Sequence, residues 1–576
     1  MSLRRDRKWV TYSIHRCSRE LSHTSLHSHR NQSKDSNVTH KHQSTAGAFG
    51  RRGRRLVPLA AAAAAIAVAA TGCTTGAGAS AGPTAAGQVS TDTIRTVLNA
   101  DPTSFAPVEV RNADDYMANR LLFSTLVRRD ENNKIVSDLA TKWDITPTQG
   151  TFTIRGGATC SDGTPITASV VAESLKVFAS PDSKSSFRPL VLGEGPATVT
   201  ADDAASTVTI KLAQPWSDLL QGMSLHATGI VCPAGLKDPK ALTAGDVAGA
   251  FSGPYTLAKK QHGVGYTFTL RDDYKTWPAY ETTIEGTPAK TIEASVNANA
   301  SAVSNELLTG TKDIANIRGK DSTRFDGDRD FSATTVPQGS LYIMFNERPG
   351  HPFADPTLRK AVAQALNVTA FNQAASGGLG EIYSSFAHPG VPCSNKDTSL
   401  LIKSDPAAAR KALASVKIRM VGAQVFGPNG AANTYVAEAL RAAGADIELR
   451  NVDLATWSTD LTQKLDTWDI TVMGGINAGG TMFGALSTVV GVPVEKGGLN
   501  WGGNENQPVL ELVARAMTQT NATERCSTYE DAQKVMIGEA HVVPLASLPS
   551  QVTIRSGFAM HTMNGQPDES TMRITK

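Results

Sequence analysis

Cysteine and aromatic residues are scarce in this sequence of 576 residues, and a hydrophobic run long enough to span a membrane is missing. The chain has 6 cysteines, and only 6% of its residues are aromatic. Because no two cysteines stand in a Cys-x-x-Cys pattern, we expect neither a zinc ribbon nor a thioredoxin-like redox site. The longest apolar run, Leu56–Ala70, is shorter than the roughly 20 residues that a helix needs to cross a bilayer. We therefore interpret it as the apolar part of a secretory signal peptide.

The residues that flank this run predict where the signal peptide is cut. Four arginines precede it at 51–55, and residues 70–72, Ala-Thr-Gly, lead to Cys73. Small residues before a cysteine resemble a lipobox, although the leucine that usually stands three places before the cysteine is Ala70 here. We predict cleavage before Cys73 and lipidation of Cys73. The alternative is an uncleaved, alanine-rich anchor.

The start of the chain also differs from the rest in composition. Segment 1–72 is predicted to be an N-terminal extension with a lipoprotein signal peptide, and 73–91, which is small, polar and glycine-rich, a flexible tether. Residues 1–50 hold six of the 12 histidines and show no apolar periodicity. We interpret them as disordered, or as sequence upstream of a true start near Val38.

Charge is the next property that excludes a class of partner. Residues 1–72 hold 13 of the 56 Lys and Arg but only 3 of the 53 Asp and Glu. This leaves 43 basic and 50 acidic residues after position 72, a net charge of −7. Because this part is mildly acidic and its basic residues are spread out, we do not expect nucleic acid as a partner.

Hydrophobic patterning predicts two kinds of architecture. Apolar and polar residues alternate at 151–156, 207–212 and 266–271, which is typical of half-buried antiparallel strands. A β-α-β-α-β order further along predicts a parallel sheet, in which ligands gather beyond the carboxyl ends of the strands. Its elements are a strand at 418–423, a helix at 431–444, a strand at 445–452, a helix at 454–465 and a strand at 468–475. Near the end of the chain, a helix is predicted to begin at Ser527, with Glu530 completing a capping box.

Motifs for catalysis and metal binding are missing. No Gly-x-Ser-x-Gly, His-Glu-x-x-His or P-loop pattern occurs, and no two of the six histidines after residue 72 share a short motif. We therefore expect no enzymatic activity, no cofactor and no metal site. Apart from Cys17 and Cys73, an even number of cysteines remains, which predicts two disulfides with three possible pairings.

Four blocks of sequence carry a resemblance when they are taken together. They are Ser137–Leu175, which contains "SDGTPITASVVAESL"; Phe251–Leu257, "FSGPYTL"; Phe345–Asn367, "FNERPGHPFADPTLRKAVAQALN"; and Glu524–Leu545, a helix leading to "VVPL". In this order and spacing they resemble the extracellular solute-binding proteins of peptide/nickel-type ABC importers, family 5. The resemblance covers about 92–576.

The resemblance implies an α/β fold, a two-lobed clamp like that of periplasmic binding proteins (type II, cluster C-like) with mixed sheets. Lobe 1 would be 92–290, completed by 545–576, and lobe 2 would be 291–544. Two crossover strands would form the hinge, and ligand would be enclosed between the lobes on closure. In this layout the pairings that keep each disulfide within one lobe are Cys160–Cys232 and Cys393–Cys526.

The resemblance also implies a role. A monomeric receptor would capture a peptide or peptide-like small solute and deliver it to an ABC permease with its ATPase. It would be exported and lipid-anchored at the outer face of the cytoplasmic membrane, and the anchor would be its only membrane contact. The expected ligand-binding residues are Phe105, Tyr342, Phe345, Tyr383, Phe386, Gly475, Asn477 and Trp501.

One departure from the family bears on the ligand. Peptide-binding relatives usually place an aspartate shortly after the strand that corresponds to 468–475, where it pairs with the peptide's α-amino group. Here no acid lies between Asp469 and Glu495. Because a buried ammonium without a carboxylate is costly, the alternative ligands are a blocked or modified peptide, a neutral or anionic small molecule, or a metal chelate. Two other functions stay open, a lipid-anchored hydrolase and a receptor-like lipoprotein for signalling or adhesion.

Overall fold

A computed structural model describes residues 90–183, 185–477, 479–563 and 566–575, all within one compact unit, Ser80–Lys576. The signal peptide, Cys73 and nearly all of the tether lie outside the described residues. No helix in the described part of the chain is both long and apolar enough to cross a membrane.

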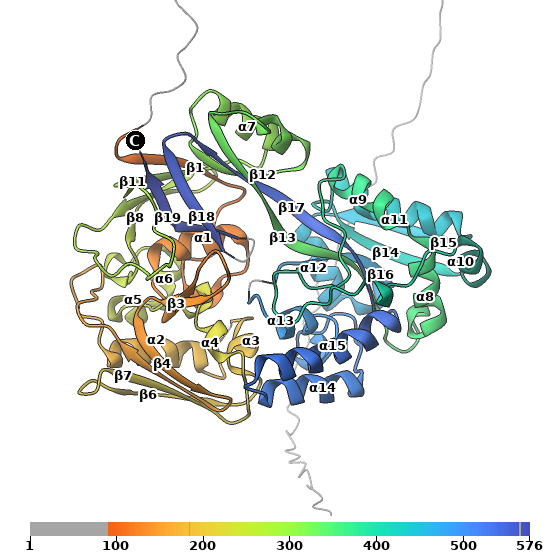
Figure 1. Cartoon of the computed structure of the whole chain (residues 1–576), viewed down its shortest axis with the longest axis horizontal. Helices are drawn as coiled ribbons and strands as arrows, with labels where there is room; N and C mark the ends of the chain where they lie inside the picture. The colour runs from red at the N-terminus through yellow and green to blue at the C-terminus, as the bar shows by residue number, and fades with distance from the viewer. Residues whose placement is uncertain (1–89, 184, 478, 564–565, 576) are drawn as a thin grey trace, which may run out of the picture. The chain divides into compact units, whose positions relative to one another are not determined.

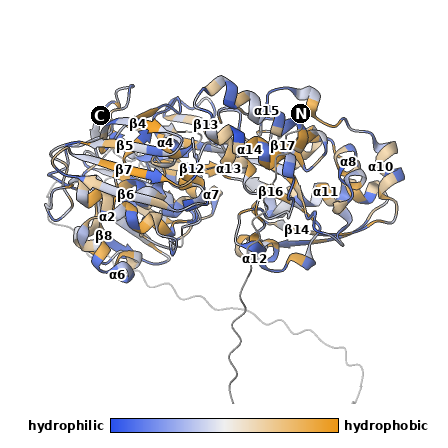
Figure 2. Cartoon of the chain, turned by 90° about the horizontal axis from the view of Figure 1, so that it is seen from below, coloured by the Kyte–Doolittle hydropathy of each residue, from blue (hydrophilic) through white to orange (hydrophobic). Residues whose placement is uncertain are grey.

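Two four-stranded sheets, the first antiparallel and the second mixed, build the N-terminal lobe (Figure 1). The first has the order β4-β5-β7-β6, and its strands β5 and β7 bury every second residue, as the alternating pattern predicts. Figure 2 shows hydrophobic stretches along these strands beside hydrophilic ones. The strands are β4 (Ala140–Thr146), β5 (Gln149–Ile154), β7 (Thr207–Leu212) and β6 (Ala197–Asp202). Helix α2 (Ala168–Ala179) contacts β6 and β7, and the Thr167 side chain caps it by accepting a hydrogen bond from the N–H of Val170.

The second system of this lobe has the order β1-β11-β9-β8. Its strands are β1 (Thr93–Leu98), β11 (Thr291–Val296), β9 (Gly265–Leu270) and β8 (Tyr255–Gln261). Strand β11 runs parallel to β1 and antiparallel to β9. A small sheet of β10 (Thr287–Pro288), β19 (Gln566–Ile574) and β18 (Phe558–Met563) brings the C-terminal end of the chain to this lobe.

The C-terminal lobe is built on the predicted parallel unit. The order β14 (Lys417–Ala423), α11 (Ala431–Ala442), β15 (Asp446–Val452), α12 (Leu454–Gln463) and β16 (Ile470–Gly475) confirms the β-α-β-α-β prediction. Strand β14 pairs in parallel with both β15 and β16. The full sheet has the order β12-β17-β13-β16-β14-β15, with β12 at Ile314–Arg318, β13 at Phe331–Phe345 and β17 at Val542–Arg555. The unit places the carboxyl end of β16 where the two lobes meet (Figure 1).

Two long antiparallel strands connect the lobes. Strands β13 (Phe331–Phe345) and β17 (Val542–Arg555) run side by side from one lobe to the other (Figure 1). Their register shifts between Pro337 and Gly339, and Pro337 lies opposite Pro549. Since proline has no N–H to donate, the ladder of backbone hydrogen bonds is interrupted on both strands at this point.

Both disulfides form as predicted. Cys160 bonds to Cys232 in the N-terminal lobe, and Cys393 bonds to Cys526 in the C-terminal lobe. The predicted helix start at Ser527 is wrong. Helix α15 begins at Ala522, because the Asn521 side chain accepts hydrogen bonds from the N–H groups of Thr523 and Glu524 and therefore caps the helix one and a half turns earlier.

Candidate functional site

A cavity of about 270 Å³ lies where the carboxyl end of β16 faces the start of α1 (Ala113–Leu122). We name it the aromatic cavity. Its lining residues come from both lobes and include four aromatic rings of the C-terminal lobe and one of the N-terminal lobe. They are Arg111, Asn112, Ala113, Tyr116, Tyr342, Phe386, Trp457, Met473, Gly474, Gly475, Ile476, Asn477, Gly484, Ala485, Thr488 and Trp501.

The N-terminal lobe contributes the beginning of helix α1. Asn112 caps this helix by accepting from the N–H groups of Asp114 and Asp115, and the Asp115 carboxylate accepts in return from the Asn112 N–H. The start of a helix carries a partial positive charge. Arg111 directly precedes the cap and is exposed. One turn into the helix, Tyr116 stacks on the His226 ring, with ring centroids 4.3 Å apart.

The C-terminal lobe contributes most of the aromatic surface. Trp457, on α12, lies 5.4 Å from Trp501 between ring centroids, and its Nε1 donates to Thr471 Oγ1 at 2.9 Å. Tyr342, on β13, packs edge-on against Phe386 at 6.3 Å. The Tyr342 hydroxyl lies 3.2 Å from Thr488 Oγ1, and burial raises its pKa to about 12, so that it stays protonated at neutral pH.

The glycines at the end of β16 are needed for packing. A Cβ at Gly474 would lie 2.3 Å from a ring carbon of Phe426, and one at Gly475 would lie 3.1 Å from a ring carbon of Tyr342. After the strand, Asn477 donates through Nδ2 to the carbonyl of Thr481 at 2.7 Å. This bond fixes the turn that closes one side of the aromatic cavity.

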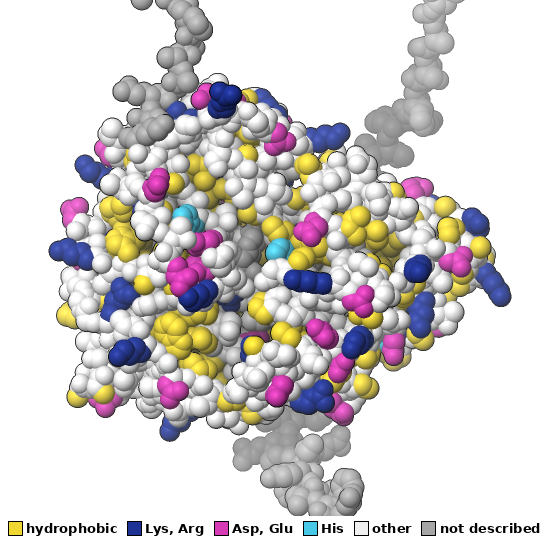
Figure 3. Space-filling model, viewed as in Figure 1, with side chains coloured by type: hydrophobic (Ala, Val, Ile, Leu, Met, Phe, Trp, Pro, Cys, Tyr) yellow, Lys and Arg dark blue, Asp and Glu magenta, His cyan; other side chains and the backbone are white. Residues whose placement is uncertain are grey.

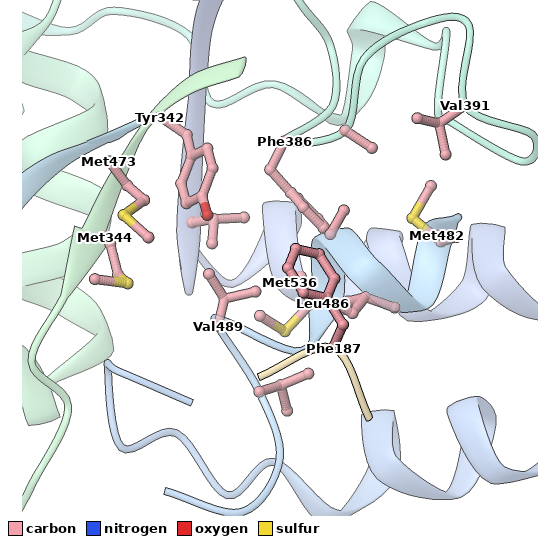
Figure 4. Close-up of a cluster of buried hydrophobic side chains, with 14 of the residues drawn as sticks. Phe187, Tyr342, Met344, Phe386, Val391, Met473, Met482, Leu486, Val489 and Met536 are labelled. Carbon is pink, nitrogen blue, oxygen red and sulfur yellow. The ribbon is translucent and has the colours of Figure 1, made fainter. Parts of the chain in front are cut away.

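The two lobes touch one another beside the cavity. Phe187 of the N-terminal lobe is buried among side chains of the C-terminal lobe, with Leu486, Phe386 and Met536 drawn around it in Figure 4. Trp216 packs edge-on against Phe483 with 4.6 Å between ring centroids. Ser217 Oγ donates to the Met517 carbonyl at 2.8 Å. These contacts join the lobes without covalent linkage.

Acidic side chains near the aromatic cavity are engaged elsewhere. Asp469 pairs with Arg419, with 2.6 Å between nitrogen and oxygen, and also accepts from His351 at 2.9 Å. Burial alone would raise the pKa of Asp469, but the hydrogen bonds from Arg419 and His351 outweigh it and lower the pKa. Glu495 pairs with Arg348 at 2.6 Å. Among the described lining residues, Arg111 is therefore the one with a charged side chain.

Five of the eight predicted ligand-binding residues line the aromatic cavity, and three lie elsewhere. The five are Tyr342, Phe386, Gly475, Asn477 and Trp501. Phe105 is buried in the core of the N-terminal lobe, 5.9 Å from Tyr266 between ring centroids.

The other two are buried in the C-terminal lobe. Phe345 is fully buried, 4.9 Å from Phe353. Tyr383 is 1% exposed and packs against His388.

Arg111, Tyr116 and Trp457 are among the lining residues that were not predicted. Helix α12 follows β15 directly, so the first turns of this helix stand at the rim of the parallel sheet. The position of Trp457 in the first turns of this helix was the feature of the sequence that could have predicted it as a lining residue. No pattern in the sequence indicates which residues of the N-terminal lobe face that rim, because the contact joins segments more than 200 residues apart.

Two larger cavities lie away from the helix start and the glycine turn. One of about 470 Å³ is mostly apolar and is bounded by both lobes around Trp216 and Phe483. The other, of about 350 Å³, lies within the C-terminal lobe beside Leu366 and Val543. The part of the chain that the structure describes contains no group of three or more His, Cys, Asp or Glu placed to hold a metal ion.

Comparison with known proteins gives concordant results. The sequence model described as "Bacterial extracellular solute-binding proteins, family 5 Middle" matches residues 134–492. A substrate binding protein from Microbacterium hydrocarbonoxydans, solved in complex with 4-hydroxybenzoate hydrazide, is 41% identical. That alignment covers 84% of this chain and all of that one, with a TM-score of 0.76.

More distant relatives come from Escherichia coli. The periplasmic murein peptide-binding protein MppA is 23% identical over 519 residues, which covers 83% of this chain and 92% of that protein. Its solved structure superposes with a TM-score of 0.71 and covers 85% of this chain and 99% of that one, and at 20% identity it shows the likeness of fold alone. The probable D,D-dipeptide-binding protein DdpA aligns over 182 residues at 29% identity, which is 28% of this chain and 33% of that protein.

Proposed function

Because the chain belongs to the bacterial extracellular solute-binding proteins of family 5, we propose that it captures a small aromatic, peptide-like solute without a free ammonium group and delivers it unaltered to an ABC permease. By peptide-like we mean a solute that carries an aromatic ring and, on the ring or within a few bonds of it, an amide, hydrazide or carboxylate group. This narrows the peptide or peptide-like solute expected from the sequence.

The observation that carries the proposal is the chemistry of the aromatic cavity. Aromatic rings from both lobes line it, and Arg111 is the charged member of its described lining. A ligand ammonium enclosed here would lose its water shell without gaining a carboxylate, which is costly. An aromatic ring with a carbonyl or carboxylate group suits this surface, because the helix start and Arg111 favour partial or full negative charge.

The relative from Microbacterium hydrocarbonoxydans supports this choice. Its ligand, 4-hydroxybenzoate hydrazide, joins an aromatic ring to an acyl hydrazide. A cavity of about 270 Å³ is at the small end of ligand sites, which is consistent with a single-ring solute rather than a long peptide.

The location, the oligomeric state and the lobe boundaries that we propose extend the prediction made from the sequence. We place the protein outside the cytoplasmic membrane, held there by a lipid on Cys73, and acting as a monomer with its permease and ATPase. For the lobes, the pairing of β11 with β1 supports a first lobe that continues past residue 290 toward β12. The second lobe would then begin along β13.

Calorimetric titration with a matched set of ligands tests the proposal. We expect 4-hydroxybenzoate hydrazide and N-acetyl-phenylalanine amide to bind at least about tenfold more tightly than phenylalanine amide, whose free ammonium would lie unpaired in the cavity. Tighter binding of the free amine would contradict the proposal. Mass spectrometry of the ligand after incubation adds a second check, since a chemically changed product would favour the hydrolase alternative.

A further inference from the structure

Three buried arginines lie together behind the aromatic cavity, and they differ in how they are paired. Arg128, on β2 (Val127–Arg129), forms an ion pair with Asp138 at 3.0 Å. Arg129, the next residue, donates to Ser224 Oγ at 3.0 Å, to Asn133 Oδ1 at 3.2 Å and to the carbonyl of Gly479 in the other lobe. All of these acceptors of Arg129 are neutral.

Arg120, on α1, has the weakest set of partners. It is 8% exposed, and it donates a long hydrogen bond of 3.5 Å to the carbonyl of Ser224. Among the described residues, no carboxylate oxygen lies within 4.0 Å of the guanidinium of Arg120 or of Arg129. The nearby carboxylate of Asp568 accepts at 2.6 Å from Tyr280 and at 2.6 Å from Ser570.

A separate small cavity of about 30 Å³ lies between these two arginines, and we name it the arginine cavity. Its polar lining comes from Arg120, Arg129, Ser224, His226 and Gln566, and its apolar lining is Leu225, Met563 and Pro567. His226 Nδ1 is buried and has no hydrogen-bond partner. Burial, together with the three arginines, lowers the pKa of His226 well below its usual value, so the ring is neutral and keeps one N–H to donate.

The arrangement is unfavourable if the arginine cavity holds nothing but water. Two buried guanidinium groups repel one another and lose hydration, and burial lowers the pKa of Arg129 to about 10. The ionised carboxylate of Asp568 attracts Arg120 but forms no ion pair with it within 4.0 Å, so this charge offsets the cost only in part. Glu569 does not compensate, because burial raises its pKa to about 8 and keeps it mostly protonated at neutral pH. The volume is that of about two waters, which also accommodates one chloride ion or one carboxylate group.

We propose that the arginine cavity binds one small monovalent anion between Arg120, Arg129 and His226. The anion is either a free ion such as chloride or the carboxylate of the captured solute, and the second source rests on the proposed function. His226 stacks on Tyr116, which lines the aromatic cavity, and Arg129 reaches Gly479 across the lobes. A bound anion therefore stabilises both the floor of the aromatic cavity and a contact between the lobes.

Thermal unfolding at constant ionic strength tests the free-ion source. We expect sodium chloride, bromide or formate to raise the Tm by about 2–4 °C over sodium gluconate, whose anion is too large for the cavity. Arg120→Gln should lose this response. Arg515→Gln, which removes an exposed charge from α14 (Gln507–Thr518), should keep it.

Calorimetry with paired ligands tests the solute source. If the solute supplies the anion, 4-hydroxybenzoate should bind at least about tenfold more tightly than 4-hydroxybenzamide, chloride should compete, and Arg120→Gln should remove the preference. If the wild-type protein responds to chloride but binds none of these aromatic ligands, the proposed function fails while the anion site stands.

Crystals grown in sodium bromide keep the proposal testable if Arg120→Gln does not fold. An anomalous peak between Arg120 and His226 in the wild-type protein would support the site. The proposal is overturned if the wild-type protein shows no anion response, no preference for the carboxylate ligand, and only water in this cavity.

Discussion

The N-terminal lobe brings the start of helix α1, Arg111 and a single ring to the aromatic cavity, whereas the C-terminal lobe brings four aromatic rings and a glycine turn. Behind these surfaces the lobes also differ. The N-terminal lobe buries two arginines, Arg120 and Arg129, for which the structure shows no ion pair, while the C-terminal lobe pairs a buried acid, Asp469, with Arg419 and His351. We infer that the C-terminal lobe supplies most of the contact area for a solute and the N-terminal lobe supplies the preference for negative charge.

The face in view in Figure 3 shows no such division of charge. Lys and Arg side chains alternate there with Asp and Glu, and histidines are few. The contrast between the lobes concerns the groups that line the aromatic cavity or lie behind it, which substitutions can test one lobe at a time.

The largest effect is expected from the disulfides, one in each lobe. Replacing both cysteines of either bridge with serine should cost about 4 kcal/mol of stability, because the closed loops span 72 and 133 residues and the entropy of closing a loop grows slowly with its length. Differential scanning calorimetry should show a similar loss for the two pairs. A loss for only one pair would mean that the lobes depend on their bridges unequally.

The next largest effect is expected from removing the buried charge of Asp469 in the C-terminal lobe. Asp469→Asn should destabilise the protein by about 3 kcal/mol at pH 7, because Arg419 and His351 would lose their charged partner. Since the folded pKa of Asp469 is lowered, its contribution is fully present above about pH 4 and is lost as the pH falls through the folded pKa. Urea unfolding at pH 7 and at pH 3 measures this. An equal difference between wild type and variant at both pH values would contradict the assignment.

Removing an aromatic side chain of the C-terminal lobe from the aromatic cavity should reduce the affinity for ligand more than it reduces the stability of the protein. We expect Trp501→Ala to reduce the affinity for 4-hydroxybenzoate hydrazide about 30-fold, or about 2 kcal/mol, as measured by calorimetry. Trp143→Ala is the matched control, since Trp143 lies on β4 and does not line the aromatic cavity. Equal affinities of the two variants would remove Trp501 from the proposed site.

The smallest effect is expected from the charge of the N-terminal lobe. Arg111→Gln should weaken binding of 4-hydroxybenzoate about fivefold and leave 4-hydroxybenzamide unchanged, because an exposed charge contributes about 1 kcal/mol. The difference should shrink in 0.5 M salt. An equal loss for both ligands would show that Arg111 acts through shape rather than charge.

Much of the fold follows from local patterns, whereas the site follows only in part. Alternation predicted β5 and β7, and the β-α-β-α-β order predicted the rim that holds Gly475 and Asn477. Tyr342 and Phe345 show what the local sequence does not predict. They are three residues apart on β13, so they point to opposite faces of the sheet, and only Tyr342 reaches the aromatic cavity. The face that meets the cavity depends on how the lobes pack, which no local pattern reports.

Strands β13 and β17 connect the lobes as one antiparallel pair, and this arrangement has a mechanical consequence. Two strands side by side form a flat strap that is stiff within its own plane and bends most readily across its thin dimension. The facing prolines, Pro337 and Pro549, weaken this strap at one level along its length. The lobes should therefore open by rotating about a single hinge axis rather than by many independent motions. One pair of spectroscopic labels, one on each lobe, should then report the full range of this rotation.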